Sequence, residues 1–209
     1  MIESLDPRLA LALLAIGAYL IGSLSFAVIV SRLFGLADPR TYGSGNPGAT
    51  NVLRSGNKGA AILTLLFDAL KGYIPVVIGA HAGLDALQLT VIGLGAFIGH
   101  LWPIFFKFEG GKGVATAAGV LLGFGGALGG AVLLVWVIMA AVFRYSSLAA
   151  LTASLAAPVL QWWLQGLGPQ TWGVLLMSAL LIWRHEANIR KLLAGQESKL
   201  GQKAAPPQA

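Results

Sequence analysis

The chain has 209 residues, of which 56% are hydrophobic and only 11% are charged. This composition is typical of an integral membrane protein and leaves no room for a large soluble core. The absence of cysteine from the sequence excludes disulfides, thiolate nucleophiles and acyl-cysteine intermediates. The eight carboxylates are few and scattered along the chain. We therefore expect no metal, no cofactor and no nucleic-acid partner.

An uncharged apolar run covers residues 9–31, after a short charged head. It is long enough to cross a hydrocarbon core about 30 Å thick. A secretory signal would begin with basic residues, continue with a shorter apolar core and end at a cleavage site, and these features are not evident. The run therefore predicts a single, retained first transmembrane helix.

Six further apolar runs follow, and each predicts one more span. They cover residues 59–78, 87–106, 114–124, 128–142, 148–164 and 171–183. The run 114–124 is about half as long as a bilayer requires, and short helices in membranes commonly mark a binding site. The sequence thus predicts an all-α integral membrane protein with seven transmembrane helices, the fourth short. Residues 1–197 form a single polytopic domain, followed by a disordered tail, 198–209.

The lysines and arginines fall in alternate loops of this arrangement. Basic residues follow spans one, three, five and seven, whereas the loops 81–86, 125–127 and 165–170 contain none. The positive-inside rule places basic loops in the cytoplasm. We therefore expect the N-terminus outside and the C-terminus cytoplasmic.

A small, turn-rich stretch, the first polar segment (residues 44–54), lies after the first span. Its glycines let the backbone approach a ligand closely. Thr50 or Asn51 is expected to cap a helix that begins near Val52, and N–H groups at a helix start suit an anion. The alternatives are an ordinary loop or a dinucleotide fingerprint, and the latter lacks the strand that must precede it. The candidate binding residues are Ser44, Gly45, Asn46, Gly48, Thr50, Asn51 and Arg54.

The second polar segment (residues 109–116) leads into the short fourth span. It contains Gly110, Gly111, Lys112 and Gly113. It is not a phosphate-binding P-loop, because Gly113 stands where serine or threonine must follow the lysine. Glycines, a lysine charge and a helix start still suit an anion.

The third polar segment (residues 184–190) follows the last span. His185 and Asn188 are three residues apart on an expected helical continuation and share a face. His185 is a candidate base or anion donor, and the alternative is a histidine satisfied at the membrane interface. Arg184 and Arg190 are interpreted as part of the basic cluster that ends a span.

Asp68 and Lys71 lie three residues apart inside the second span, so they share a helix face. Charges within a span are costly and usually face protein or water. One interpretation is an intrahelical ion pair whose lysine snorkels to the interface. The other is that the pair supports a buried polar site.

Three motifs resemble those of the bacterial acyl-phosphate:glycerol-3-phosphate acyltransferases, the PlsY family. The first is Ser44-Gly45-Asn46-x-Gly48-Ala49-Thr50-Asn51-Val52-x-Arg54. The second is Gly110-Gly111-Lys112-Gly113-Val114-Ala115-Thr116. The third is Arg184-His185-x-x-Asn188-Ile189-x-Lys191-Leu192-Leu193-x-Gly195-x-Glu197. The resemblance covers nearly the whole chain.

The resemblance implies a multi-pass enzyme of the bacterial inner membrane whose active site faces the cytoplasm. It would transfer a fatty acyl group from acyl phosphate to the 1-hydroxyl of glycerol 3-phosphate, giving lysophosphatidic acid and phosphate. The enzyme that makes acyl phosphate would be a functional partner. Ser44, His185 and Asn188 would line the reacting centre, with His185 or a substrate phosphate as the base. Arg54, Lys112 and the glycines would bind phosphate, supported by Asp68, Lys71 and Glu197.

Two other classes are considered for this sequence. Thioester-using glycerolipid acyltransferases typically have a His-x4-Asp pair, and no histidine here is followed by aspartate at that spacing. A transporter of a phosphorylated metabolite would fit the short helix and the basic loops. The absence of a recognisable internal repeat disfavours it.

Overall fold

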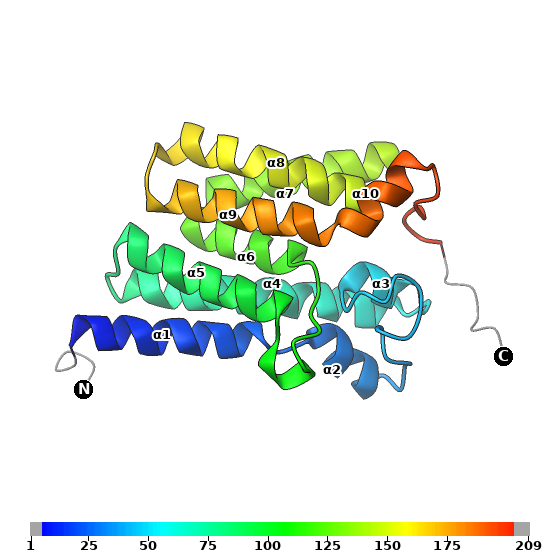
Figure 1. The fold of residues 1–209 in the computed structure, drawn as a ribbon, viewed down its shortest axis with the longest axis horizontal. Helices are drawn as coiled ribbons and strands as arrows, with labels where there is room; N and C mark the ends of the chain where they lie inside the picture. The colour runs from blue at the N-terminus through cyan, green and yellow to red at the C-terminus, as the bar shows by residue number, and fades with distance from the viewer. Residues whose placement is uncertain (1–5, 203–209) are drawn as a thin grey trace.

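The computed structural model describes residues 6–202, which fold entirely into helices, loops and turns without a strand. Figure 1 shows the helices aligned along one long axis. The elements are α1 (Pro7–Gly22), α2 (Phe26–Leu33), α3 (Ala49–Leu53), α4 (Lys58–His81), α5 (Ala86–Leu101), the 3-10 helix η1 (Ile104–Phe106), α6 (Val114–Phe124), α7 (Gly126–Phe143), α8 (Ser146–Gln165), α9 (Pro169–Arg184) and α10 (Glu186–Leu193). The predicted all-α integral membrane architecture is confirmed.

Small residues let α4 and α6 pack backbone against backbone. A Cβ atom added to Gly119 would lie 1.9 Å from the Ala69 carbonyl oxygen, and one added to Gly72 would lie 2.2 Å from that of Thr116. The hydrophobic effect does not drive helices together in lipid, so van der Waals packing at such close approach holds them in contact. It holds the short α6 firmly against a full-length neighbour.

The outer surface of the bundle carries exposed apolar side chains, for example on α7 and α8. Leu134, Val142 and Leu155 are each more than half exposed. An exposed apolar face of this size would be unfavourable in water and is suited to lipid. The interior contains fully buried Phe97 and Leu128.

Four helices are long and apolar enough to cross a membrane, and a fifth span results if α1 and α2 are counted together. The α6 helix has 11 residues and α9 has 16, so both are shorter than a typical crossing helix. Length and composition in residues 6–202 therefore support four or five spans, fewer than the predicted seven.

The prediction of one continuous first helix over residues 9–31 is wrong. The helix stops at Gly22, and α2 restarts at Phe26 with a bend of 43°. The Leu24 carbonyl within this break accepts a hydrogen bond of 2.7 Å from the Lys71 ammonium. Because a charged donor satisfies the free carbonyl, the break is tolerated inside an apolar environment.

Lys71 is therefore not a snorkelling lysine. Its side chain is buried, and its ammonium lies 2.7 Å from the Asp68 carboxylate on the same helix. The intrahelical ion pair is confirmed, but the pair faces the protein interior and contacts the break between α1 and α2.

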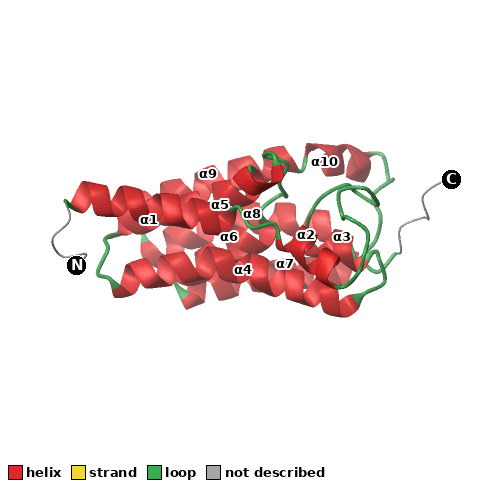
Figure 2. Ribbon diagram, turned by 90° about the horizontal axis from the view of Figure 1, so that it is seen from below, coloured by secondary structure: helices red, strands yellow, loops and turns green. Residues whose placement is uncertain are grey.

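The polar segments gather at the end of the bundle opposite to the N-terminus. Figure 1 shows α2, α3 and α10 at this end, and Figure 2 shows most of the loop structure there as well. The predicted disordered tail falls largely on residues 203–209, which lie outside the described residues. The chain before them is placed by contacts, since the Leu200 N–H donates to the Arg144 carbonyl at 2.7 Å.

Candidate active site

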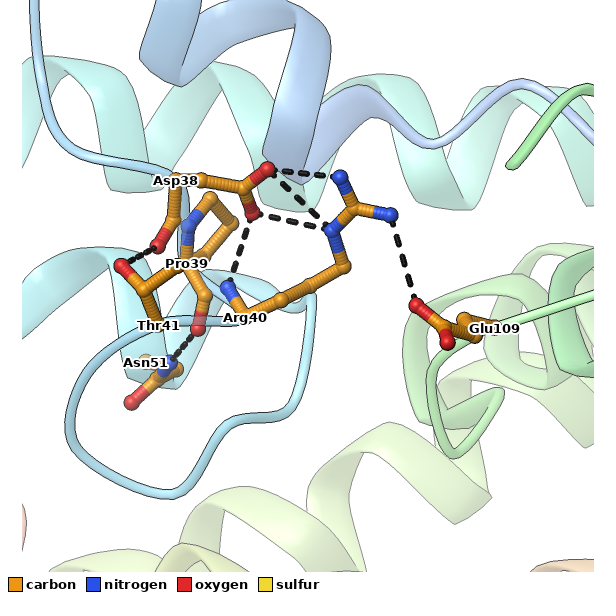
Figure 3. Close-up of polar contacts among 6 residues, drawn as sticks. All are labelled: Asp38, Pro39, Arg40, Thr41, Asn51 and Glu109. Carbon is orange, nitrogen blue, oxygen red and sulfur yellow. Dashed lines mark hydrogen bonds and ion pairs between the residues drawn. The ribbon is translucent and has the colours of Figure 1, made fainter. Parts of the chain in front are cut away.

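The first polar segment is organised around the side chain of Asn51. Its Oδ1 accepts the Ser44 N–H at 3.0 Å, and its Nδ2 donates to the carbonyls of Pro39 at 2.6 Å and Tyr42 at 3.1 Å. Figure 3 shows the contact with Pro39. Since the Asn51 side chain is buried and its amide is used by the loop, it shapes the site and does not face a ligand.

The expected helix of this segment begins earlier than predicted. The α3 helix starts at Ala49 with Gly48 before it, so neither Thr50 nor Asn51 is its cap. The Thr50 hydroxyl instead lies 3.0 Å from the Ser146 hydroxyl at the start of α8. This contact ties the first polar segment to a distant helix.

Ser44 is an exposed residue beside an open hollow. The hollow has a volume of about 360 Å³ and is lined by residues 40–45. The Ser44 hydroxyl accepts only a long hydrogen bond, 3.4 Å, from the Asn46 N–H. Its oxygen therefore keeps capacity to bind a ligand.

The second polar segment presses against the end of α5. The Gly111 N–H donates to the His100 carbonyl at 3.1 Å. A Cβ atom at Gly111 would lie 2.2 Å from His100 Nε2 and 3.0 Å from the Pro47 carbonyl oxygen. The absence of a side chain at Gly111 thus allows the first and second polar segments to touch.

Arg184 holds the same segment from α9. Its guanidinium donates to the Gly110 carbonyl at 2.7 Å and to the Gly111 carbonyl at 3.2 Å. The sequence interpretation of Arg184 as a simple span-ending cation missed this role. No local sequence signal could have found it, because the partners lie more than 70 residues away.

Lys112 belongs to a chain of hydrogen bonds that joins the second and third polar segments. Its ammonium donates to Asn188 Oδ1. The Asn188 Nδ2 donates to Glu197 at 2.8 Å, and the Ser147 hydroxyl donates to the same carboxylate oxygen at 2.8 Å. Glu197 therefore fixes which end of the Asn188 amide faces Lys112.

Three further cations act on Lys112 in this chain of hydrogen bonds. Burial lowers the pKa of Lys112 to about 8, Glu197 opposes the shift, and the nearby charges of Arg184, Arg54 and Lys191 add to it. Arg54 itself donates to the Ser198 hydroxyl. A group of cations opposed by the single carboxylate of Glu197 has the charge that would suit a phosphate anion.

His185 lies at a break between α9 and α10, so the expected helical continuation is interrupted. The ring is buried, and its Nδ1 lies 2.8 Å from the Leu181 carbonyl. This contact assigns the proton to Nδ1 and leaves the lone pair on Nε2. Burial lowers the pKa of His185 to about 4, so the ring is neutral at pH 7.

An ion-pair cluster at the surface joins the loop that precedes the first polar segment to the second polar segment. Arg40 contacts Asp38 through two nitrogens, at 2.7 Å and 3.0 Å, and reaches Glu109 at 3.7 Å. Figure 3 shows the Arg40 side chain between the two carboxylates. The hydrogen bond from Arg40 lowers the pKa of Asp38. Sequence reasoning did not identify this cluster.

The supporting pair Asp68 and Lys71 lies deeper than the loops. His100 Nδ1 is 3.7 Å from the Asp68 carboxylate. His100 in turn contacts Gly111 through its carbonyl, as described above. The pair is therefore connected to the second polar segment through one histidine, and within residues 6–202 it forms no hydrogen bond or ion pair with the other candidate residues.

Fold and site together define an α-helical membrane protein with a polar, cation-rich end. The family model for glycerol-3-phosphate acyltransferase matches residues 12–195. Glycerol-3-phosphate acyltransferases of Burkholderia lata and Burkholderia vietnamiensis are 61% and 60% identical over 193 residues, with 91% of each chain covered.

Two solved structures have the same fold. One is the glycerol 3-phosphate form of PlsY, an integral membrane glycerol 3-phosphate acyltransferase, with a TM-score of 0.88, 39% identity and coverage of 92% of this chain and 96% of that one. The other is the lysophosphatidic acid form of PlsY, with a TM-score of 0.85, 38% identity and coverage of 91% and 95%. The chain belongs to the PlsY family of glycerol-3-phosphate acyltransferases.

Proposed function

We propose that this protein transfers a fatty acyl group from acyl phosphate to the 1-hydroxyl of glycerol 3-phosphate, giving lysophosphatidic acid and phosphate. The main observation is the cation cluster of Arg54, Lys112, Arg184 and Lys191, opposed by Glu197 alone among the charges that shift the pKa of Lys112. Both proposed substrates are phosphate anions, with which Arg54, Lys112 and Lys191 can form charge-assisted hydrogen bonds. The apolar outer surface suits the acyl chain.

The reaction needs one nucleophilic attack and one proton transfer. The glycerol 1-hydroxyl oxygen forms a bond to the acyl carbon, and the bond between that carbon and the bridging oxygen breaks, releasing phosphate. Cations around the leaving group stabilise the charge that develops on it. Ser44 lines the centre and orients the hydroxyl, and direct transfer requires no acyl-serine.

A substrate phosphate oxygen is the proposed proton acceptor. A phosphate monoester has a second pKa of about 6. The pKa of about 4 makes His185 the weaker base of the two. In this proposal His185 accepts a hydrogen bond at Nε2 and positions the hydroxyl, while the phosphate takes the proton.

The orientation of the chain in the membrane is part of the same proposal. The bundle crosses seven times, with α6 and α9 as short crossings, so that the N-terminus is outside and the active site is cytoplasmic. The basic residues of alternate loops support this arrangement. Cysteines introduced at Ala82 and Lys58, at opposite ends of α4, should be labelled from opposite sides of the membrane. Labelling from one side would contradict the topology.

The decisive experiment is turnover by the purified protein in detergent. Glycerol 3-phosphate is supplied with acyl phosphate or with acyl coenzyme A of equal chain length. We expect lysophosphatidic acid from acyl phosphate only, because the short loops provide no docking surface for a large nucleotide headgroup. Comparable turnover with the thioester would reject the donor. The absence of product from either donor would favour a carrier.

A further inference from the structure

A single guanidinium from α9 binds two consecutive carbonyls of the second polar segment. Arg184 donates from one nitrogen to the Gly110 carbonyl at 2.7 Å and from Nε to the Gly111 carbonyl at 3.2 Å. The side chain is half-buried, and its neighbour Trp183 packs against Trp102 at 6.1 Å between ring centroids. The ends of α5 and α9 are therefore in contact next to Arg184.

The first of the two peptide groups is held at both ends. In a trans peptide the carbonyl and the N–H point in opposite directions. The Gly110 carbonyl binds Arg184 on one side, and the Gly111 N–H binds the His100 carbonyl on the other. This peptide plane cannot rotate without breaking one of these hydrogen bonds.

The second peptide group is held at its oxygen only. Because the Gly111 carbonyl points to Arg184, the Lys112 N–H points away from it. Within residues 6–202 no acceptor bonds to this N–H. The Lys112 side chain, which belongs to the cation cluster, donates to Asn188 Oδ1.

We propose that Arg184 is a positioning residue that fixes the Lys112 peptide so that its N–H donates to the bound phosphate. This inference rests on the proposed function, in which Lys112 contacts a phosphorylated substrate. The backbone N–H and the ammonium of one residue then act on the same anion. Arg184 affects binding through the loop and not by touching substrate.

A guanidinium is suited to this role and an ammonium is not. Its Nε and terminal nitrogens present donors in a fixed plane that can reach two neighbouring carbonyls at once. A lysine at this position would keep the charge but bind one carbonyl at a time. The glycines are also required, since a Cβ at Gly110 would lie 2.2 Å from the His100 carbonyl oxygen and 2.3 Å from that of Leu101.

The test measures dissociation constants of glycerol 3-phosphate and of inorganic phosphate by calorimetry for wild type, Arg184→Lys and Arg184→Ala. Calorimetry reports the affinity of the folded molecules. A variant that only reduces the folded fraction therefore lowers the binding stoichiometry and leaves the dissociation constant unchanged. We expect both variants to bind both anions about ten- to a hundredfold more weakly, corresponding to the loss of the one charge-assisted hydrogen bond from the Lys112 N–H. The lysine variant should be within about threefold of the alanine variant.

Arg190→Lys is the matched control, because Arg190 is exposed and, among the residues that the structure describes, pairs only with Glu186, four residues away. Its affinity should equal that of wild type. Retention of affinity by Arg184→Lys alone would show that Arg184 acts as a charge, and unchanged affinity in both Arg184 variants would also overturn the proposal. These measurements use no acyl donor. Failure of acyl phosphate as a donor would therefore reject the proposed reaction and leave this result standing.

Discussion

The first and second polar segments are both glycine-rich, yet they are stabilised in different ways. In the first, the Asn51 amide binds three backbone groups within 12 residues. In the second, the peptides are held by Arg184 from α9 and by His100 at the end of α5. A loop that is organised locally should tolerate small backbone changes, whereas a loop clamped by other helices should not.

Substitution of glycine by alanine should show the largest difference between the two segments. A Cβ at Gly111 would lie 2.2 Å from His100 Nε2 and 3.0 Å from the Pro47 carbonyl oxygen, so the loop must shift. We expect Gly111→Ala to lower kcat/KM by about a hundredfold or more, because a 1 Å displacement of a catalytic group costs on this order.

The matched variant is Gly45→Ala in the first polar segment. Its nearest contact would be an ordinary 3.6 Å, although its φ of +67° adds strain of about 1 kcal/mol. Steady-state kinetics on both folded variants provides the measurement, and we expect a loss of about tenfold or less. Equal losses in the two variants would contradict the contrast between the segments.

Removal of one cation from each segment should have the next largest effect. Lys112→Ala and Arg54→Ala each delete a charge-assisted contact of about 1.5–3 kcal/mol, so substrate affinity should fall about ten- to a hundredfold. Calorimetric titration with glycerol 3-phosphate measures the change, and circular dichroism checks the fold. Unchanged affinity in a folded Lys112→Ala protein would remove this residue from the site.

The pH dependence sharpens the comparison between these two cations. The ammonium of Lys112 has a pKa lowered to about 8 by burial, so it loses its proton as the pH rises through 8. We expect kcat/KM, which reports the free enzyme, to fall about fivefold between pH 8 and pH 9. In Lys112→Arg the fall should disappear, since a guanidinium stays charged in this range. A profile that is the same in both proteins would assign the titration to another group.

The surface ion pair between Arg40, which precedes the first polar segment, and Glu109 in the second should matter least. Arg40 and Glu109 are separated by 3.7 Å, and the Glu109 side chain is 70% exposed. Exposed pairs contribute about 0–1 kcal/mol, so Glu109→Gln should change KM by less than about fivefold. Addition of salt should reduce even this difference. A larger effect would mean that the second polar segment depends on its ion pair with the loop that precedes the first.

The sequence by itself determined the helical architecture and the residue types that gather at the polar end. Apolar runs give helices because a buried or lipid-facing backbone must satisfy its own hydrogen bonds, and six of the seven predicted runs correspond to α4 through α9 within a few residues, apart from the end of α5. The glycines and cations of the motifs likewise predicted an anion site from local residue types alone.

Tertiary contacts decided the rest. The break in the first helix depends on Lys71, which is 47 residues from the carbonyl it binds, and Arg54 meets Ser198 across 144 residues. From its position in the sequence, Arg184 could be identified only as a basic residue at the end of a span. Helix packing places its guanidinium within hydrogen-bond distance of two glycine carbonyls. Such roles depend on which helices lie side by side. Local composition does not contain that information.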